Sequence, residues 1–243
     1  MVRIWGLSGS GFVIRSGDDV IYIDPWLVPP DPSRTTHRVY PPPFPPDAVR
    51  KALAVLSTHE HEDHCNSQTL LGLNKFTGAK FLGPNSSTKK AEAAGYHLSD
   101  IVTLGPGDSY DISPSFTVRA FEARDPYEGS ALMYLIETPR GNIFHSGDTS
   151  YFDGFKKVGD GYEVDVALLN FGKQIPTAEK PYYMNADRVA SAARDLRARI
   201  VVPMHWNLWV ETREDPRPIE PILRSMSPDS KLLILEGGEK LEL

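Results

Sequence analysis

Residues 59 to 64 read His-Glu-His-Glu-Asp-His, so three imidazoles and three carboxylates fall within six residues. This run follows Leu53–Leu56, a short apolar segment that predicts a buried strand. The fold must therefore present a polar loop at the end of a core strand. Core packing gains nothing from such side chains, and a solvated face would more often use Lys and Glu. Neutral imidazoles and carboxylates are ligands for Zn²⁺, Mn²⁺ or Fe²⁺, and this spacing suits two adjacent metal ions.

The composition is that of a globular protein, with 243 residues, of which 40% are hydrophobic and 24% charged. We expect a single domain over residues 1–243, because no linker interrupts the chain. The net charge of −6 argues against long nucleic acid as a partner, although a local basic pocket is compatible with it. The chain has one cysteine, Cys65, and it shows neither an apolar leader nor an apolar run of about 20 residues. These features predict a cytoplasmic protein without a membrane span.

Strand and helix patterns alternate along the chain, which predicts an α/β layered fold. The expected strands are Gly11–Ile14, Val20–Asp24, Leu53–Leu56, Lys80–Leu82, Ile101–Leu104, Phe116–Phe121, Leu132–Glu137, Asn142–His145, Val164–Leu169, Ile200–Pro203 and Lys231–Leu235. The expected helices are Asn66–Leu73, Ser87–Ala94, Ala186–Leu196 and Pro218–Met226.

A proline-rich segment, Leu27–Pro46, interrupts this pattern with eight prolines in 20 residues. Proline fixes φ and removes a hydrogen-bond donor, so the segment is predicted to be a stiff loop. It is either a plain surface loop or a flap beside a functional site, and Pro42–Pro45 also fits a PxxP ligand for another protein.

Three further polar residues follow predicted strands. Asp24 ends an early strand, Asp148 comes after the strand Asn142–His145 through a Gly turn, and His205 follows Ile200–Pro203. Each position alone is weak evidence for a site, since an Asp after a strand is often a turn residue. Their order, taken with the His-rich loop, predicts one site at one edge of a packed sheet.

These motifs, His-x-His-x-Asp-His, then Ser-Gly-Asp-Thr at residues 146–149, then a His that follows a strand, resemble the metallo-β-lactamase superfamily. Within it the chain is most similar to the L-ascorbate-6-phosphate lactonase branch. The segments that carry this similarity are residues 58–66, 105–108, 134–141, 144–151 and 201–209. The resemblance implies a four-layer αββα sandwich with the site at one edge of its two sheets, and this branch tends to form homo-oligomers.

The resemblance also implies a role for each site residue. His59 and His61 would bind a first metal ion, while Asp63, His64 and His205 would bind a second. Asp148 would bridge the two ions. Asp24 would orient the ligands without touching a metal, so its loss should weaken metal binding and leave the fold intact.

The chain departs from the superfamily at one ligand position. Most members have a further His for the first metal between the two main motifs, but residues 118–125 contain none. Asp125, as in the lactonase branch, or else Glu122 would fill that place. A carboxylate makes the site harder and shifts its preference from Zn²⁺ toward Mn²⁺ or Mg²⁺. We therefore expect two divalent ions, either Mn²⁺ or Zn²⁺.

The implied chemistry is hydrolysis of a small anionic substrate. Metal ions lower the pKa of bound water to about 7, so a bridging hydroxide near Asp63 and Asp148 would attack a carbonyl or phosphorus. Asp63 would then pass a proton to the leaving oxygen. Five residues near these motifs are candidates for substrate binding: Arg124, Asn170, Lys173, Tyr183 and Trp206.

Three functions remain open on the sequence. The leading one is a lactonase that acts on a sugar-phosphate type of lactone. The second is a phosphodiesterase or nuclease that uses the same dinuclear site. The third is a non-catalytic metal-binding protein, which the complete ligand set argues against. A shared fold does not decide among them.

Overall fold

The computed structural model describes residues 1–31, 37–174 and 183–243. Two seven-stranded mixed sheets lie face to face in this part of the chain, in the orders β14-β1-β2-β3-β4-β5-β6 and β13-β12-β11-β10-β9-β8-β7. The first sheet contains β1 (Val2–Ser8), β2 (Gly11–Ser16), β3 (Asp19–Ile23), β4 (Ala54–Leu56), β5 (Lys80–Gly83), β6 (Ile101–Thr103) and β14 (Lys240–Glu242). The second contains β7 (Ser109–Ser113), β8 (Phe116–Glu122), β9 (Leu132–Thr138), β10 (Gly141–His145), β11 (Val166–Asn170), β12 (Ile200–Met204) and β13 (Lys231–Leu232).

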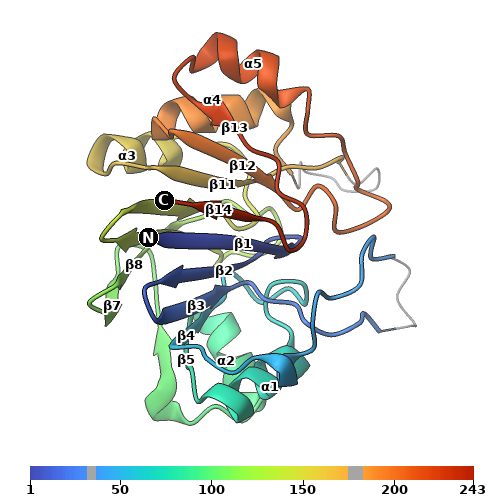
Figure 1. Ribbon diagram of the computed structural model, residues 1–243, viewed down its shortest axis with the longest axis vertical. Helices are drawn as coiled ribbons and strands as arrows, with labels where there is room; N and C mark the ends of the chain where they lie inside the picture. Colours follow the sequence, from blue (N-terminus) through green and yellow to red (C-terminus); the bar gives the residue numbers. More distant parts are fainter. Residues whose placement is uncertain (32–36, 175–182) are drawn as a thin grey trace.

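Helices cover the outer faces of both sheets, which gives the four layers seen in Figure 1. Over the first sheet lie α1 (Ser67–Thr77) and α2 (Asn85–Ala93), and over the second lie α3 (Gly154–Gly161), α4 (Ala186–Leu196) and α5 (Ile219–Met226). Two short 3-10 helices, η1 (Pro46–Ala48) and η2 (Leu98–Asp100), sit in connections. The predicted αββα sandwich is therefore confirmed.

The register of the first sheet separates its two faces. Ile4, Ile14, Ile21 and Ala54 are paired across β1 to β4 and are fully buried in the core between the sheets. Because successive side chains on a strand point to opposite faces, their chain neighbours lie on the outer face. Two further clusters of buried apolar side chains fill the space between each sheet and its outer layer.

Every strand and helix expected from the sequence is present, with ends shifted by a few residues. Among the described residues, three strands and one α-helix were not anticipated, namely β1, β7, β14 and α3, and neither were the 3-10 helices η1 and η2. Helix α3 begins and ends at glycines, which weaken a helix pattern in sequence. Its internal Gly159 is required by packing, because a Cβ there would lie 2.1 Å from the Asp195 carbonyl oxygen of α4.

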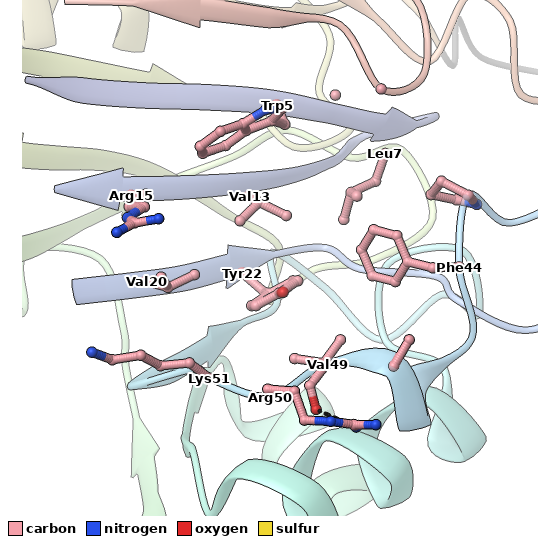
Figure 2. A pocket seen from close by; sticks show the side chains of 14 residues that line it. Trp5, Leu7, Val13, Arg15, Val20, Tyr22, Phe44, Val49, Arg50 and Lys51 are labelled. Atoms are coloured by element: carbon pink, nitrogen blue, oxygen red, sulfur yellow. Dashed lines mark hydrogen bonds between the residues drawn. The ribbon is translucent and has the colours of Figure 1, made fainter. Parts of the chain in front are cut away.

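The proline-rich segment forms a connection without a strand or α-helix in its described parts, as predicted, while residues 32–36 lie outside the described residues. Its middle part adjoins the loop after β12, since the Val39 N–H donates to the Leu208 carbonyl (2.8 Å) and the Val210 N–H donates to the His37 carbonyl (2.8 Å). Further on, Phe44 packs against the outer face of β1–β3, as Figure 2 shows. The segment thus covers part of the outer face of the first sheet and also borders the loop that follows β12.

No helix in residues 1–31, 37–174 and 183–243 combines the length and the apolar character that crossing a bilayer would need.

Candidate metal centre

The predicted site residues meet where parallel strands of the two sheets end. Strands β3 to β6 are parallel to one another, and so are β10 to β13. Asp24 directly follows β3, the His-rich loop follows β4, and Asp148 and His205 follow β10 and β12. The carboxyl ends of such strands are where open α/β sheets bind ligands. The structure therefore brings residues that are far apart in sequence to one edge, as expected.

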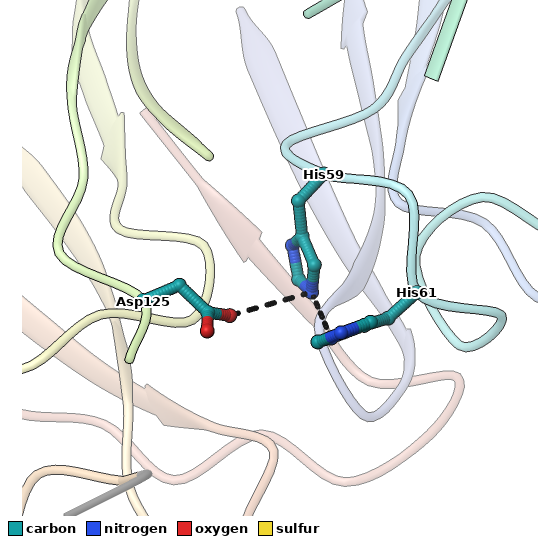
Figure 3. A group of neighbouring side chains, drawn as sticks. All are labelled: His59, His61 and Asp125. Atoms are coloured by element: carbon teal, nitrogen blue, oxygen red, sulfur yellow. Dashed lines mark hydrogen bonds and ion pairs between the residues drawn. The ribbon is translucent and has the colours of Figure 1, made fainter. Parts of the chain in front are cut away.

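One ligand group combines the His-rich loop with the β8–β9 connection (Figure 3). His59 Nε2 lies 2.9 Å from His61 Nδ1 and 3.9 Å from Asp125 Oδ2. The other oxygen of Asp125 accepts the N–H groups of Tyr127 (2.7 Å) and of the following residue, while Oδ2 is buried without a hydrogen-bond partner among the described residues. Glu122, the alternative to Asp125, is exposed at the end of β8 and is not in the group.

Two further ligand groups lie beside the first, and they are linked in series: His59 belongs to the first group and to one of the others, and His64 belongs to both of the others. Asp63, His64 and His205 form one, with His205 Nε2 at 3.2 Å and His64 Nε2 at 3.8 Å from Asp63 Oδ2. His59, His64 and Asp148 form the other. Asp148 Oδ2 is 3.5 Å from Nε2 of both His64 and His205, and its Oδ1 has no described hydrogen-bond partner. Asp148 thus lies between the two imidazole sets.

Asp24 holds this arrangement from behind. Its carboxylate accepts the N–H of Thr58 (2.8 Å), the hydroxyl of Thr58 (2.7 Å) and Nδ1–H of His64 (2.7 Å), and all three residues are fully buried or nearly so. Because Asp24 holds Nδ1, it is Nε2 of His64 that faces Asp63 and Asp148, and this nitrogen has no described hydrogen-bond partner. That is the orientation a metal ligand requires. Thr58 was not singled out from the sequence.

The charges of the site also favour a cation. Burial lowers the pKa of His59 well below its usual value, so its imidazole is neutral. Burial has the same tendency at His64, but the carboxylates of Asp148 and Asp24 outweigh it and raise the pKa of His64. Burial likewise opposes the charge on Asp148, yet the neighbouring His205 and His64 hold its pKa well below the usual range. Asp148 thus stays ionised in a buried place, and the unpartnered ligand atoms fit divalent metal ions.

A turn in the first sheet positions two strand-end loops of the second sheet. The sequence Ser8-Gly9-Ser10-Gly11 forms a tight connection between β1 and β2. The Gly9 carbonyl accepts the backbone N–H of His205 (3.0 Å), and the Ser10 carbonyl accepts Nε2–H of His145 (2.8 Å). His145 Nδ1 in turn accepts the Gly147 N–H (3.1 Å), so this buried histidine orients the turn that carries Asp148.

The glycine in that turn is necessary. Gly147 has a φ of +56°, and a Cβ on it would lie 2.9 Å from the Cβ of Thr58. His205 itself has a φ of +71°, which is uncommon outside glycine and frequent at functional sites.

The five candidates for substrate binding fall into two groups. Arg124 and Lys173 are exposed cations on connections that border the site, and Arg124 stacks over the ring of Phe152 at 4.5 Å. Tyr183 is buried with its ring 4.8 Å from that of His205.

The remaining two candidates lie deeper. Asn170 is fully buried, where its amide accepts from the Ser146 hydroxyl (3.4 Å) and donates to the Thr149 carbonyl (3.2 Å). Trp206 is buried in the cluster between the second sheet and its helices. Both side chains therefore contact protein groups around the site loops.

Replacing Asp24 by Asn keeps its shape but removes the negative charge behind His64. We expect the affinity for the bound metal to fall by about 10- to 100-fold. The measurement is a competition titration of Mn²⁺ and Zn²⁺ against a chelator of known affinity. Asp108→Asn, which alters a carboxylate that accepts a turn N–H in the loop before β7, is the control and should leave the affinity unchanged. Equal affinities in both variants would contradict the role given to Asp24.

The comparisons with known proteins place this chain among the metal-dependent hydrolases. A family model described as a beta-lactamase superfamily domain matches residues 20–206. The chain belongs to this superfamily.

Three relatives illustrate the range of the similarity. A metal-dependent hydrolase from Pyrobaculum arsenaticum is 26% identical over 96% of both chains. A probable L-ascorbate-6-phosphate lactonase from Salmonella heidelberg is 28% identical over 76% of this chain and 57% of its own length. Among solved structures, a metallo hydrolase from the hyperthermophilic archaeon Ignicoccus hospitalis superimposes with a TM-score of 0.79 at 25% identity, covering 100% of this chain and 99% of its own.

Proposed function

We propose that this hydrolase opens a lactone ring in a small anionic substrate of the sugar-phosphate type, and that it uses two divalent metal ions. The observation that carries the proposal is a series of three ligand groups, in which His59 links the first to the second and His64 links the second to the third. Overlapping groups of this kind suit two neighbouring ions better than one. The similarity to a probable L-ascorbate-6-phosphate lactonase supports the choice of substrate class.

In this proposal His59, His61 and Asp125 hold one ion, Asp63, His64 and His205 hold the other, and Asp148 contacts both. When bound, such ions supply water of lowered pKa and polarise the substrate oxygen. The protein contributes by fixing the donor atoms in a buried place, where Asp24 and His145 hold His64 and the Asp148 turn in position. Fixed dipoles and charges of this kind need no reorganisation during the reaction.

Asp63 is the group that would move the proton. Its Oδ2 faces Nε2 of His205 at 3.2 Å, and the side chain is 13% exposed, whereas those of His64 and Asp148 are almost fully buried. A carboxylate at the border between the buried ligands and solvent can accept a proton from water and deliver it to the leaving oxygen. The product of a lactone would be the ring-opened hydroxy acid.

Exposed cations beside the site would hold the anionic part of the substrate. Arg124 and Lys173 have this character, and Tyr183 would place its ring against the substrate next to His205. Asn170 and Trp206, whose side chains contact protein groups, would act by holding the site loops.

Asp125→His tests the metal preference. Replacing the carboxylate by imidazole makes the first ligand group softer, so the affinity for Zn²⁺ relative to Mn²⁺ should rise by about tenfold or more. Competition titrations with both metals measure this ratio. Glu122→His adds the same imidazole three residues earlier at an exposed position and should leave the ratio unchanged. A shift in the Glu122 variant alone would assign the ligand position to residue 122.

The function is tested with a substrate panel on the Mn²⁺ and Zn²⁺ forms of the protein. The panel sets lactones with and without a phosphate or carboxylate group against bis-p-nitrophenyl phosphate. We expect the highest kcat/KM on an anionic lactone. Selective cleavage of the phosphodiester would contradict the lactonase function and indicate a phosphodiesterase that uses the same metal centre. No turnover of any substrate by protein that retains its metals would support the non-catalytic alternative.

A further inference from the structure

A second site lies on the outer face of the first sheet, away from the metal ligands. Helices α1 and α2 cover the part of this sheet around β4 to β6, but over β1 to β3 the cover is the connection that contains η1. Between this connection and the strands is a cavity of about 690 Å³. That volume is in the range of small-molecule sites.

The strand register makes one wall of the cavity continuous. Trp5 of β1 pairs with Val13 of β2, and Val13 pairs with Tyr22 of β3, so these side chains form a row on the outer face. Leu7 extends the wall along β1, and Phe44 faces the row from the covering connection (Figure 2). If this outer face met only water, it would carry polar side chains at these positions. This face is instead built of aromatic and aliphatic groups.

The wall of the cavity also contains a hydroxyl group. Tyr22 is 6% exposed, and its hydroxyl has no hydrogen-bond partner in the described residues although it is not sealed from solvent. Burial raises the pKa of this phenol, so the hydroxyl stays protonated and can donate to an acceptor.

Positive charge is concentrated around the cavity. Of the described residues that line it, Arg15, Arg50 and Lys51 are basic and none is acidic, in a chain whose net charge is −6. Arg15 pairs across the strands with Val20, and the Val20 carbonyl accepts the N–H of Leu53, which fixes the segment containing Lys51 beside it. Arg15 and Lys51 therefore flank the same end of the cavity (Figure 2).

The two arginines have their own backbone contacts. Arg15 donates to the Gly17 carbonyl (2.7 Å), and Arg50 donates to the carbonyl of Asp47. Arg15 also forms an exposed ion pair with Asp18 (3.4 Å), which is a weak interaction that an anionic ligand can replace. Lys51 has no hydrogen bond or ion pair in the described part of the chain, and its ammonium group is exposed. A cation that is committed to no protein carboxylate can pair with a ligand.

We propose that this cavity binds a small amphipathic carboxylate, with its apolar body against Trp5, Val13 and Phe44 and its anionic head at Arg15 and Lys51. Apolar walls favour the body of the ligand and the charges select an anion over a neutral molecule of the same shape. The proposal is independent of the reaction at the metal centre, because none of the metal-ligand candidates lines the cavity.

Titration calorimetry with octanoate and 1-octanol on the full-length, metal-loaded protein tests this site. We expect saturable octanoate binding with a Kd on the order of 1 mM or lower, and weaker binding of 1-octanol. The double variant Arg15→Glu/Lys51→Glu should weaken octanoate binding about tenfold, since it replaces two attractions by repulsions. Lys157→Glu, an exposed change on α3, is the matched control and should change the Kd by less than about twofold.

Two further arms make the result decisive. Val13→Trp fills the cavity without changing charge and should abolish binding of both ligands, with far-UV circular dichroism confirming the fold. A carboxylate can also bind a metal, so Asp148→Ala must retain the octanoate affinity.

Any of four results would overturn the proposal. The first is that octanoate binding does not saturate, and the second is that the double variant binds octanoate as tightly as the wild-type protein. The other two are that Asp148→Ala loses octanoate binding, and that the protein binds phosphatidylglycerol vesicles in preference to free octanoate.

Discussion

Asp148→Ala should lower kcat/KM by at least about 10³-fold on any substrate that the protein hydrolyses. Asp148 is the carboxylate that lies 3.5 Å from Nε2 of both His64 and His205, and it forms a ligand group with His59. Its removal takes away the anionic donor that both halves of the centre share. Steady-state kinetics together with the metal content of the purified variant measure the effect.

The matched control is Asp153→Ala. Asp153 is an exposed carboxylate five residues further along the same connection, at the start of α3, and its side chain makes no capping hydrogen bond. Its activity should stay within about twofold of the wild type. In Asp148→Ala the turn at residue 148 should keep its fold, because the hydrogen bond from the Gly147 N–H to His145 does not involve the Asp148 carboxylate. Activity retained in Asp148→Ala would remove the shared-ligand centre from the mechanism.

Chelation of the metal should abolish hydrolysis and also lower the thermal stability. Without a cation, the ionised Asp63 and Asp148 lie among imidazoles in a buried place, and the Asp125 oxygen that faces His59 has no described partner. A metal at 100 times its Kd contributes about 2.7 kcal/mol to the free energy of unfolding. For a domain of this size that corresponds to a Tm lower by roughly 5–10 °C after chelation.

Differential scanning fluorimetry and an activity assay on the same chelated sample measure both effects, and added Mn²⁺ or Zn²⁺ should restore them together. A chelator presaturated with Ca²⁺ is the control for ionic strength. Unchanged activity after complete metal removal would contradict metal-dependent hydrolysis by this centre.

Much of the fold was predictable because its elements have clear local signals. Strand Val166–Asn170 is apolar up to its last residue, and Ala186–Leu196 is a helix with an apolar face. Such patterns depend little on the rest of the chain. Helix α3 was missed since Gly154, Gly159 and Gly161 lower its helix propensity, and only contact with α4 explains Gly159. Strand β14 is three residues long and is defined by pairing with β1, at the other end of the chain.

The candidate site was predictable to the extent that its residues are concentrated in motifs. Asp125 lies near His59 and His61, while its role as a ligand in the place of the missing histidine stays a prediction. Thr58 and the Ser8–Gly11 turn could not be found in the same way. They act through backbone and hydroxyl contacts to Asp24, His205 and His145, and such contacts leave no pattern in the sequence.

The most direct measurement is anomalous diffraction from crystals of the protein loaded with Mn²⁺ or Zn²⁺. We predict two anomalous peaks about 3.5–4 Å apart, with Asp148 in contact with both. His59, His61 and Asp125 should surround one peak, and Asp63, His64 and His205 the other. A single peak, or peaks bound by other side chains while these seven residues remain without metal, would contradict the paired centre.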